Sequence, residues 1–416
     1  MSLTDVTQPA RSALVKQELD NDERTKSKEY IRLVVRAMNR LEETVTLALN
    51  WLINSDMRRA NGGYKSEYDP QTRSFGSWGG GETSILSTAA ASSALLTAKE
   101  YEDLAFDSGD NILSIQACRS DGSILAGEGS PFIYTRYIGE AIHTLLDLFR
   151  RSKKNKYLDA AIRSGKWIIE NMQKPDGSLC DGLFIAKGGE LKLRSASTWQ
   201  AENVVVFERL FQETGMELFA NAKAELVRWV SSVQRRDGSF FPLRRTGFSR
   251  GGIWDLRWAL QSLDIVPWII GWDTRKHPSS HTAALRAFLH AKDTTRALKV
   301  CSWLEHRLGP NGLFYEYYYG NSGHSTQEDV APSAQFGTTL LQYPFLQDDR
   351  NLVQSICDGV FYAQVRSPDQ NGNGGIKGTP GHVVNGNKVY TFDTSYAVLF
   401  MQNVIAGFSQ EHQLYM

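Results

Sequence analysis

The stretch WVSSVQRRDGSF, Trp229–Phe240, decides how this chain folds, because its pattern returns along the sequence. A Trp opens an apolar helical run, a Gln follows the run, and an Asp-Gly-Ser turn leads to another apolar residue. Six copies of one unit predict a repeat architecture, in which each unit buries its apolar face against its neighbours. The other copies are Trp51–Tyr64, Ile115–Ile124, Trp167–Leu179, Trp303–Phe314 and a degenerate copy at Phe361–Ile376.

The spacing of the copies gives the size of the unit. The marker glycines are separated by 60, 55, 61, 74 and 60 residues; they are Gly62, Gly122, Gly177, Gly238, Gly312 and Gly372. Each unit holds an amphipathic helical pattern that ends at the turn and, after a loop, a more apolar pattern. We therefore predict an all-α fold, a single-domain (α/α)6 toroid of six inner and six outer helices over 28–408, between a polar arm, 1–27, and a tail, 409–416.

The helical periodicity also predicts where the helices lie. The expected outer helices are 28–55, 101–117, 157–172, 218–234, 282–306 and 351–365, and the expected inner helices are 82–98, 132–151, 197–214, 253–271, 329–346 and 391–407. We attribute the turn glycines to left-handed residues just past the outer-helix ends. Loops gather at the starts of the inner helices in this arrangement, so the central cavity is expected to open on that side.

Composition limits the classes of partner. Lys plus Arg and Asp plus Glu number 46 each, so the net charge is zero and no long-range field favours nucleic acid. The four cysteines lie far apart, and the N-terminus has no apolar signal region, which together predict a cytoplasmic protein with reduced thiols. No stretch is long and apolar enough to span a membrane, and peripheral membrane contact stays open.

Metal and cofactor motifs are absent from the sequence. Gln347–Asn351 interrupts an aspartate-rich metal motif, and neither a P-loop nor an H-E-x-x-H motif occurs. His277 and His281 are four residues apart, but Pro278 and the serines between them favour a loop over a metal site. We therefore expect neither a metal nor a cofactor.

The pattern W-x5-Q-x2-DGS, followed by Leu179 or Phe240, resembles the QW-type repeats of the squalene-hopene and oxidosqualene cyclases. The domains of that family are α/α toroids. Since this chain has room for one toroid, the resemblance points to a monodomain class II terpene cyclase of the merosterolic acid synthase type. Thr391–Thr394, TFDT, aligns with the acidic motif of the family and keeps its middle Asp, which makes Asp393 the implied general acid.

The predicted inner-helix starts and cavity-side loops supply further candidates. Aromatic faces there could stabilise a cation or stack on a sugar ring. The substrate-binding candidates are Trp199, Trp254, Trp258, Tyr134, Phe336, Tyr315, Phe392 and Tyr396, with Arg136. The candidates for a second carboxylate are Asp329, Asp255 and Glu82. For each acid, the competing interpretation is a cap on a helix N-terminus.

Two enzymatic functions fit these patterns. The first is metal-independent, protonation-initiated cyclisation of a prenylated small molecule, such as a prenylated aromatic acid. The alternative rests on GGYKSEYDP, Gly62–Pro70, and on the run from Trp78 to Ala89, which resemble (α/α)6 enzymes acting on uronic acids or polysaccharides as hydrolases, lyases or epimerases. A closed aromatic pocket with one buried acid favours the cyclase, and an open groove with paired carboxylates favours the carbohydrate enzyme. A third, non-enzymatic interpretation is a helical scaffold that binds partners on its loop face.

Overall fold

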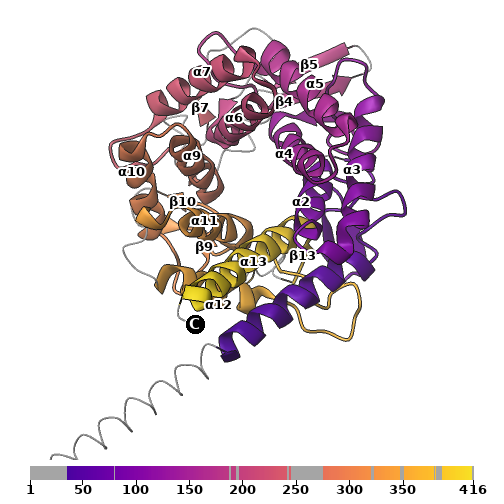
Figure 1. Ribbon diagram of the computed structural model, residues 1–416, viewed down its shortest axis with the longest axis vertical. Coiled ribbons are helices and arrows are strands. Elements are labelled where there is room, and N and C mark those ends of the chain that lie inside the picture. The colour runs from indigo at the N-terminus through magenta and orange to yellow at the C-terminus, as the bar shows by residue number, and fades with distance from the viewer. Residues whose placement is uncertain are drawn as a thin grey trace, which may run out of the picture.

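The computed structural model describes residues 35–78, 80–186, 189–193, 196–240, 243–244, 275–319, 323–346, 351–378, 380 and 387–414. Its helices form two concentric rings around a central axis (Figure 1). Within these residues, the inner ring comprises α2 (Ile85–Leu95), α4 (Thr135–Ser152), α6 (Glu202–Thr214), α9 (Pro278–His290), α11 (Val330–Gln342) and α13 (Thr391–Leu414). The outer ring comprises the helix at 35–54, α3 (Glu102–Ala117), α5 (Asn155–Met172), α7 (Glu217–Val233), α10 (Thr294–Glu305) and α12 (Asn351–Ala363). The predicted arrangement of six inner and six outer helices is confirmed.

The fourth helix pair differs from the prediction. The sequence pattern placed one outer helix at 282–306, but the structure divides this stretch into the inner helix α9 and the outer helix α10. Pro278 occupies the first turn of α9, and the Asp293 side chain caps α10 by accepting a hydrogen bond from the Arg296 amide. Helix α9 packs against both α6 and α11, so it takes the fourth inner position. The predicted inner helix at 253–271 lies outside the described residues, and at the other end α13 continues to Leu414, past its expected end.

The Gln and Trp of the repeat link neighbouring units. The Gln116 amide donates to the Ala160 carbonyl of the next outer helix at 2.9 Å. In the same direction, Gln364 donates to the Thr44 carbonyl at 2.8 Å, which joins the last unit to the first. The Trp167 indole reaches back to the carboxylate of Asp121 in the preceding turn. The repeated motif is therefore a connector between units.

The turn glycines are required by close packing with the next outer helix. Gly177 has φ +83°, and a Cβ there would lie 2.4 Å from the Glu225 carbonyl oxygen of α7. Helix α5 has already ended at Gln173, so the predicted role of a residue just past the helix end is wrong. In the sixth unit the equivalent residue is Gly374, and not the predicted marker Gly372, because Gly374 has φ +91° and meets the Leu47 carbonyl of the first outer helix. This contact closes the ring.

A buried hydrogen bond fixes four of the inner helices, α2, α9, α11 and α13, against the turn before them. The fourth residue of α2, α11 and α13 accepts a backbone N–H from the residue after the turn, as Thr88 does from Tyr64 at 2.9 Å. In α9 this residue is His281, whose Nε2 accepts from the Phe240 amide at 3.0 Å. Its Nδ1 lies 2.8 Å from the His277 carbonyl, and its ring stacks on Trp303. His277 and His281 therefore belong to a helix start, and not to the predicted loop.

His281 should make the stability of the protein depend on pH. Burial lowers the pKa of His281 to about 3, whereas the unfolded chain binds this proton below its ordinary pKa of 6.5. The contribution of His281 to the free energy of unfolding should therefore fall as pH drops from 6.5 towards 3, by about 2 to 3 kcal/mol between pH 6.5 and 4.5. Because other groups titrate in the same interval, urea unfolding of the parent and of His281→Gln is compared at pH 7.5 and 4.5, and the stability of the parent relative to the variant should shrink by this amount. A difference between the two proteins that stays the same at both pH values would contradict this role.

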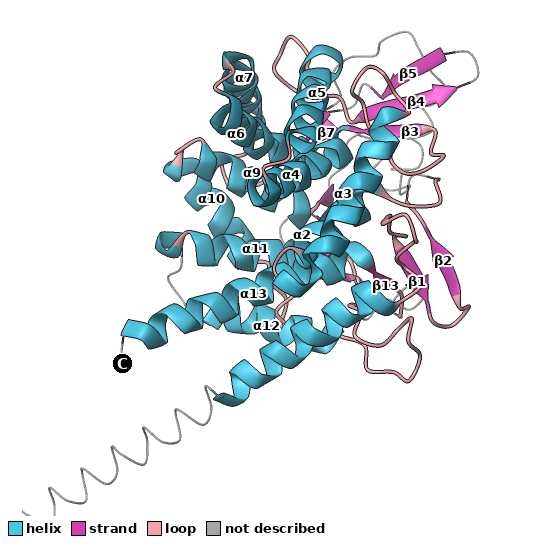
Figure 2. Cartoon of the chain, turned by 45° about the vertical axis from the view of Figure 1, so that its right-hand side comes forward, coloured by secondary structure: helices cyan, strands magenta, loops and turns pink. Residues whose placement is uncertain are grey.

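Short antiparallel strands gather on one face of the rings, where the inner helices begin (Figure 2). They are β1 (Glu67–Asp69), β2 (Ser74–Gly76), β3 (Phe132–Tyr134), β4 (Gly182–Ala186), β5 (Gly189–Leu193), β6 (Ala196–Ser197), β7 (Leu243–Arg244), β8 (Arg275–Lys276), β9 (Phe314–Tyr315), β10 (Tyr318–Tyr319), β11 (Gly323–His324), β12 (Glu328–Asp329) and β13 (Val389–Tyr390). Two of the pairings matter for the site: β13 pairs with β1, and β12 pairs with β9. They hold the chain immediately before α13 and α11.

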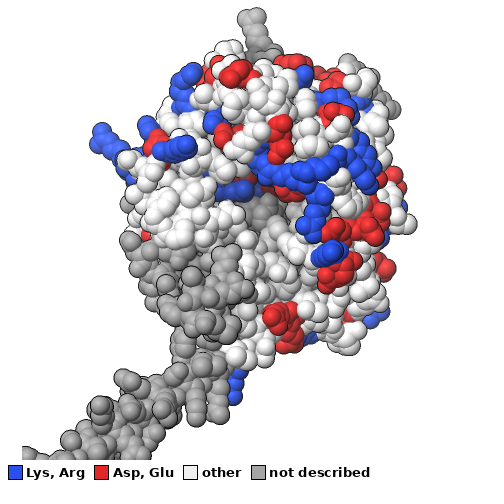
Figure 3. All heavy atoms as spheres, viewed as in Figure 1, with Lys and Arg blue, Asp and Glu red and all other residues white. Residues whose placement is uncertain are grey.

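The surface mixes charges of both signs. Basic and acidic side chains lie side by side around the central hollow of one face (Figure 3). At the turn between α4 and α5, for example, Arg150 pairs with Glu213 at 2.5 Å and Lys156 with Asp110 at 2.6 Å. Across the described part of the chain, no helix combines the length and apolarity needed to cross a membrane.

Candidate active site

Two aspartates from different repeats lie together at the strand-bearing face. Asp329 ends β12 and is the N-cap residue of α11, while Asp393 lies in the first turn of α13. Asp393 is 5% exposed, and Asp329 is partly exposed. Since α11 and α13 pack against each other, their N-termini bring these carboxyl groups close enough for their ionisations to be coupled.

Helix capping explains one of the two aspartates only in part. The Asp393 carboxylate accepts a hydrogen bond from the Ala331 amide at 3.0 Å, so it caps the neighbouring helix α11. Asp329 holds the cap position of α11, but its side chain makes no capping hydrogen bond. A Cβ at Gly378 would lie 2.9 Å from Asp393 Oδ2, so the absence of a side chain there makes room for the carboxylate.

Burial keeps protons on this pair at neutral pH. It raises the pKa of Asp393 to about 7, against the effect of the Ala331 amide. The pKa of Asp329 is raised well above its usual value by burial and by the negative charges of Asp393 and Glu316. Because a second negative charge close by is unfavourable, the pair retains one proton after the other has left. The pair then offers a proton donor beside a base.

Arg136 is a cation whose positive charge acts on Asp329. It is the second residue of α4, and its charge favours ionisation of Asp329, Glu140 and Glu202. The guanidinium lies 5.9 Å from the Trp199 ring centroid and 5.7 Å from that of Phe392. Among the described residues it has no hydrogen bond or ion pair. A half-buried guanidinium with unused donors is suited to bind a carboxylate.

Deeper in the ring, four helices contribute a polar floor. The Tyr396 hydroxyl of α13 lies 3.1 and 3.0 Å from the two carboxyl oxygens of Glu140, on α4. Glu202 of α6 pairs with Arg286 of α9 at 2.7 Å and lies 3.4 Å from His143 Nε2. Burying so many ionisable groups costs free energy. Their presence together therefore indicates a functional site.

The pKa values of the two glutamates of the floor are shifted in opposite directions. Burial and the charge of Glu202 raise the pKa of Glu140. Burial also opposes ionisation of Glu202, but Arg286 and His143 outweigh it and lower its pKa to about 2. The floor thus offers hydroxyl, carboxyl and guanidinium groups, a set suited to hydrogen bonds with a polyhydroxylated ligand.

Aromatic rings cover one side of the site. Phe392 packs with Leu86, Ala90 and Ala331 in a small cluster against which Trp78, Tyr137 and Tyr396 rest. The Trp78 ring lies 5.5 Å from that of Tyr390, and the Phe392 ring 4.7 Å from that of Tyr396. Tyr134 joins this side through its contact with Tyr137, at 4.9 Å.

Several predicted residues lie elsewhere. Phe336 is fully buried and packs on Phe314, so the structure contradicts a substrate-facing role. Tyr315 stacks on His324 at 3.8 Å and packs against the core. Trp199 is partly exposed, and its indole donates to the Ser279 hydroxyl at 2.8 Å. Asp255, Trp254 and Trp258 lie outside the described residues.

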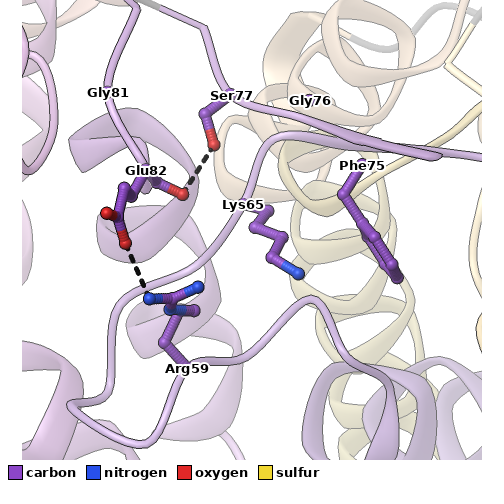
Figure 4. Close-up of a pocket in the computed structure, with 7 residues that line it drawn as sticks. All are labelled: Arg59, Lys65, Phe75, Gly76, Ser77, Gly81 and Glu82. Carbon is purple, nitrogen blue, oxygen red and sulfur yellow. Dashed lines mark hydrogen bonds and ion pairs between the residues drawn. The ribbon is translucent and has the colours of Figure 1, made fainter.

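Glu82 makes its contacts away from the Asp329–Asp393 pair. Its carboxylate forms an ion pair with Arg59 at 2.7 Å, and its side chain is 64% exposed. It lines a pocket on the rim beside β2, with Arg59 and Lys65 (Figure 4). The second carboxylate that the structure places beside Asp393 is Asp329.

The sequence analysis missed most of the floor. Glu140, His143 and Arg286 lie within helices, away from the helix starts that were searched. One signal was available: Glu140 interrupts the otherwise apolar run Ile138–Ile142, where a charged residue faces the interior for a reason. No group of three His, Cys, Asp or Glu suited to a metal ion is found among the residues that the structure describes.

Comparisons with other proteins support the fold. No protein-family model and no curated protein matches the sequence. An unsaturated glucuronyl hydrolase specific for heparin matches the structure with a TM-score of 0.64 at 10% identity, over 89% of this chain and 98% of its own. A sugar epimerase from a ruminal bacterium matches with a TM-score of 0.65 at 11% identity, over 89% of this chain and 98% of its own. Cellobiose 2-epimerase from Spirochaeta thermophila matches with a TM-score of 0.63 at 10% identity, over 91% of this chain and 98% of its own.

The chain is an (α/α)6 toroid. At these identities the likeness establishes the fold and not the reaction. The toroid expected from the cyclase resemblance is therefore confirmed, whereas none of these three structures is a terpene cyclase.

Proposed function

We propose that this toroid is a carbohydrate-active enzyme that uses the Asp329–Asp393 pair for acid–base catalysis on a uronic-acid-containing saccharide. The observation that carries the proposal is the pair itself: two carboxyl groups lie together at the strand-bearing face, and burial raises the pKa of both. Asp329 is the proton donor, and Asp393 is the base. Hydrolysis and epimerisation both need such a donor and base.

Arg136 supports an acidic sugar. Its charge acts on both Asp329 and Glu140, so the carboxylate of a uronic acid bound beside them meets a guanidinium in a partly desolvated site. The floor of Glu140, Glu202, Arg286 and Tyr396 then faces sugar hydroxyls. Trp78 and Phe392 supply the apolar side on which a sugar ring stacks.

The neighbouring structures favour the same class of substrate. The three similar structures are a glucuronyl hydrolase, a sugar epimerase and a cellobiose epimerase. The cyclase hypothesis retains one favourable observation, since Asp393 is a buried acid beside the rings of Phe392 and Tyr396. A hydrocarbon chain, however, would remove the charged groups of the floor from water without supplying a polar contact to them, at a cost in binding free energy.

A substrate panel tests the proposal. The purified protein is incubated with unsaturated uronyl disaccharides, saturated uronic-acid oligosaccharides, cellobiose, and a prenylated aromatic acid, and the products are separated by mass spectrometry and NMR. Turnover of a uronic-acid saccharide is expected, with hydrolysis adding the mass of water and epimerisation leaving the mass unchanged. Turnover of the prenylated acid with no saccharide reaction would reverse the choice between the two functions.

A further inference from the structure

A second pocket opens on the rim of the strand-bearing face. Its volume is about 430 Å³, and we call it the rim pocket (Figure 4). Its lining residues are Arg59, Lys65, Phe75, Gly76, Ser77, Gly81 and Glu82. None of them belongs to the aspartate pair or to the polar floor.

The rim pocket carries an excess positive charge. Arg59 is paired with Glu82 at 2.7 Å, which leaves Lys65 as the uncompensated cation of the lining. Within the described chain, the Lys65 amine has no ion pair and donates no hydrogen bond. It lies 3.8 Å from the centroid of the Phe75 ring, a contact that holds the amine in place without using up its N–H donors. Burial and the neighbouring Arg59 lower the pKa of Lys65, and together they outweigh the opposing charge of Asp56.

The wall of the rim pocket is firmly held. The Ser77 hydroxyl donates to the Glu82 carbonyl at 3.0 Å, and the Glu82 amide donates to the Glu128 carbonyl at 2.9 Å. Gly81 packs so closely that a Cβ there would lie 2.6 Å from the Glu128 carbonyl oxygen. The two cations therefore face a preformed recess.

The rim pocket is joined directly to the aspartate site. The Lys65 carbonyl accepts a hydrogen bond from the Thr391 hydroxyl at 2.7 Å, and the Ser66 carbonyl accepts one from the Thr391 amide at 3.0 Å. Thr391 begins α13, two residues before Asp393. Trp78 follows Ser77 of the pocket wall and rests on the cluster that contains Phe392. A chain of sugars lying over Trp78 can therefore reach both places.

We propose that the rim pocket is a second saccharide subsite, in which Lys65, supported by Arg59, binds the carboxylate or sulfate of the sugar next to the one at the aspartate pair. The proposal rests on the proposed function for the saccharide as occupant, but the anion site follows from the pocket alone. An anion there would neutralise the excess charge and fill the Lys65 donors. The enzyme would then prefer chains with at least two acidic sugars.

The test compares Lys65→Met with Lys192→Met, a control at an exposed lysine of β5 that bonds the Asn171 carbonyl. Met keeps the apolar stem of the side chain, so packing on Phe75 is largely preserved. Each change is made in the Asp393→Asn background to prevent turnover, and calorimetry measures the Kd for a uronic-acid monosaccharide and for a disaccharide of two uronic acids, the disaccharide both unsulfated and sulfated. Inorganic sulfate is titrated separately.

Lys65→Met should raise the disaccharide Kd roughly tenfold relative to the monosaccharide Kd, the effect of one charge-assisted hydrogen bond. Lys192→Met should change neither value. A larger loss for the sulfated chain identifies sulfate as the bound group, and an equal loss identifies the carboxylate. An unchanged ratio in Lys65→Met overturns the subsite. If the parent binds no saccharide, the proposed function fails, and the titration with inorganic sulfate tests the anion site by itself. Weaker sulfate binding in Lys65→Met than in the parent supports the anion site, and equal sulfate binding in the two proteins overturns it.

Discussion

Asp393→Asn should reduce turnover of the saccharide substrate by about 10³-fold, the effect expected from removing a general base. Asn keeps an oxygen in place of the carboxylate oxygen that accepts the Ala331 amide, so the cap on α11 is retained. What is lost is the ability to take up a proton. Initial rates at saturating and at low substrate concentration measure the change, and it should appear mainly in kcat.

Stability measurements separate this loss from unfolding. The folded-state pKa of Asp393, about 7, is raised above the ordinary 3.8, so the native protein loses stability as pH rises through this interval. Asp393→Asn does not titrate and should therefore be more stable than the parent at pH 8, by about 4 kcal/mol, and similar to it near pH 4. A variant that is inactive and less stable at pH 8 would indicate a structural role instead.

The pH dependence of kcat/KM adds a second readout for the same pair. Activity should rise as Asp393 ionises, with a midpoint near pH 7, and fall at higher pH as Asp329 loses its proton. Asp329→Asn should remove the alkaline limb together with most of the activity. Full turnover by either variant would remove the pair from the mechanism.

Gly312→Ala should be among the most destabilising single substitutions in this protein, lowering the free energy of unfolding by about 4 kcal/mol. Gly312 has φ +75°, and a Cβ there would lie 1.7 Å from the Ser355 carbonyl oxygen of α12. Because that atom belongs to the backbone of an outer helix, relief requires two packed units to separate. Urea unfolding with a shared m-value gives the change.

Gly215→Ala is the matched control for this glycine. Gly215 ends α6 with φ +66°, but nothing lies within 4 Å of a Cβ built there. Gly215→Ala therefore carries the conformational cost of a left-handed residue without a clash. It should lower the free energy of unfolding by only about 1 kcal/mol. Equal losses at the two positions would mean that the left-handed conformation, and not the contact between units, makes the turn glycines necessary.

The sequence predicted the positions of the helices better than the roles of the site residues. Helical periods and turn residues depend on neighbours along the chain, so the outer helices came out close to their predicted bounds, as with α5 at Asn155–Met172. The fourth pair failed because the break at Lys292 and Asp293 was read as part of one continuous helix. Asp393 was placed correctly in the first turn of an inner helix, but its proposed role has changed from acid to base.

The sequence by itself determined the repeat, the class of fold and the face on which the inner helices begin, because these follow from local periodicity and turn chemistry. Only the tertiary structure decided which side chains meet. Asp329 and Asp393 belong to different repeats, and Tyr396 reaches Glu140 across 256 residues of sequence. Closure of the ring brings these groups together, and burial within it raises the pKa values of the aspartate pair. Neither effect can be read from the residues beside them in the chain.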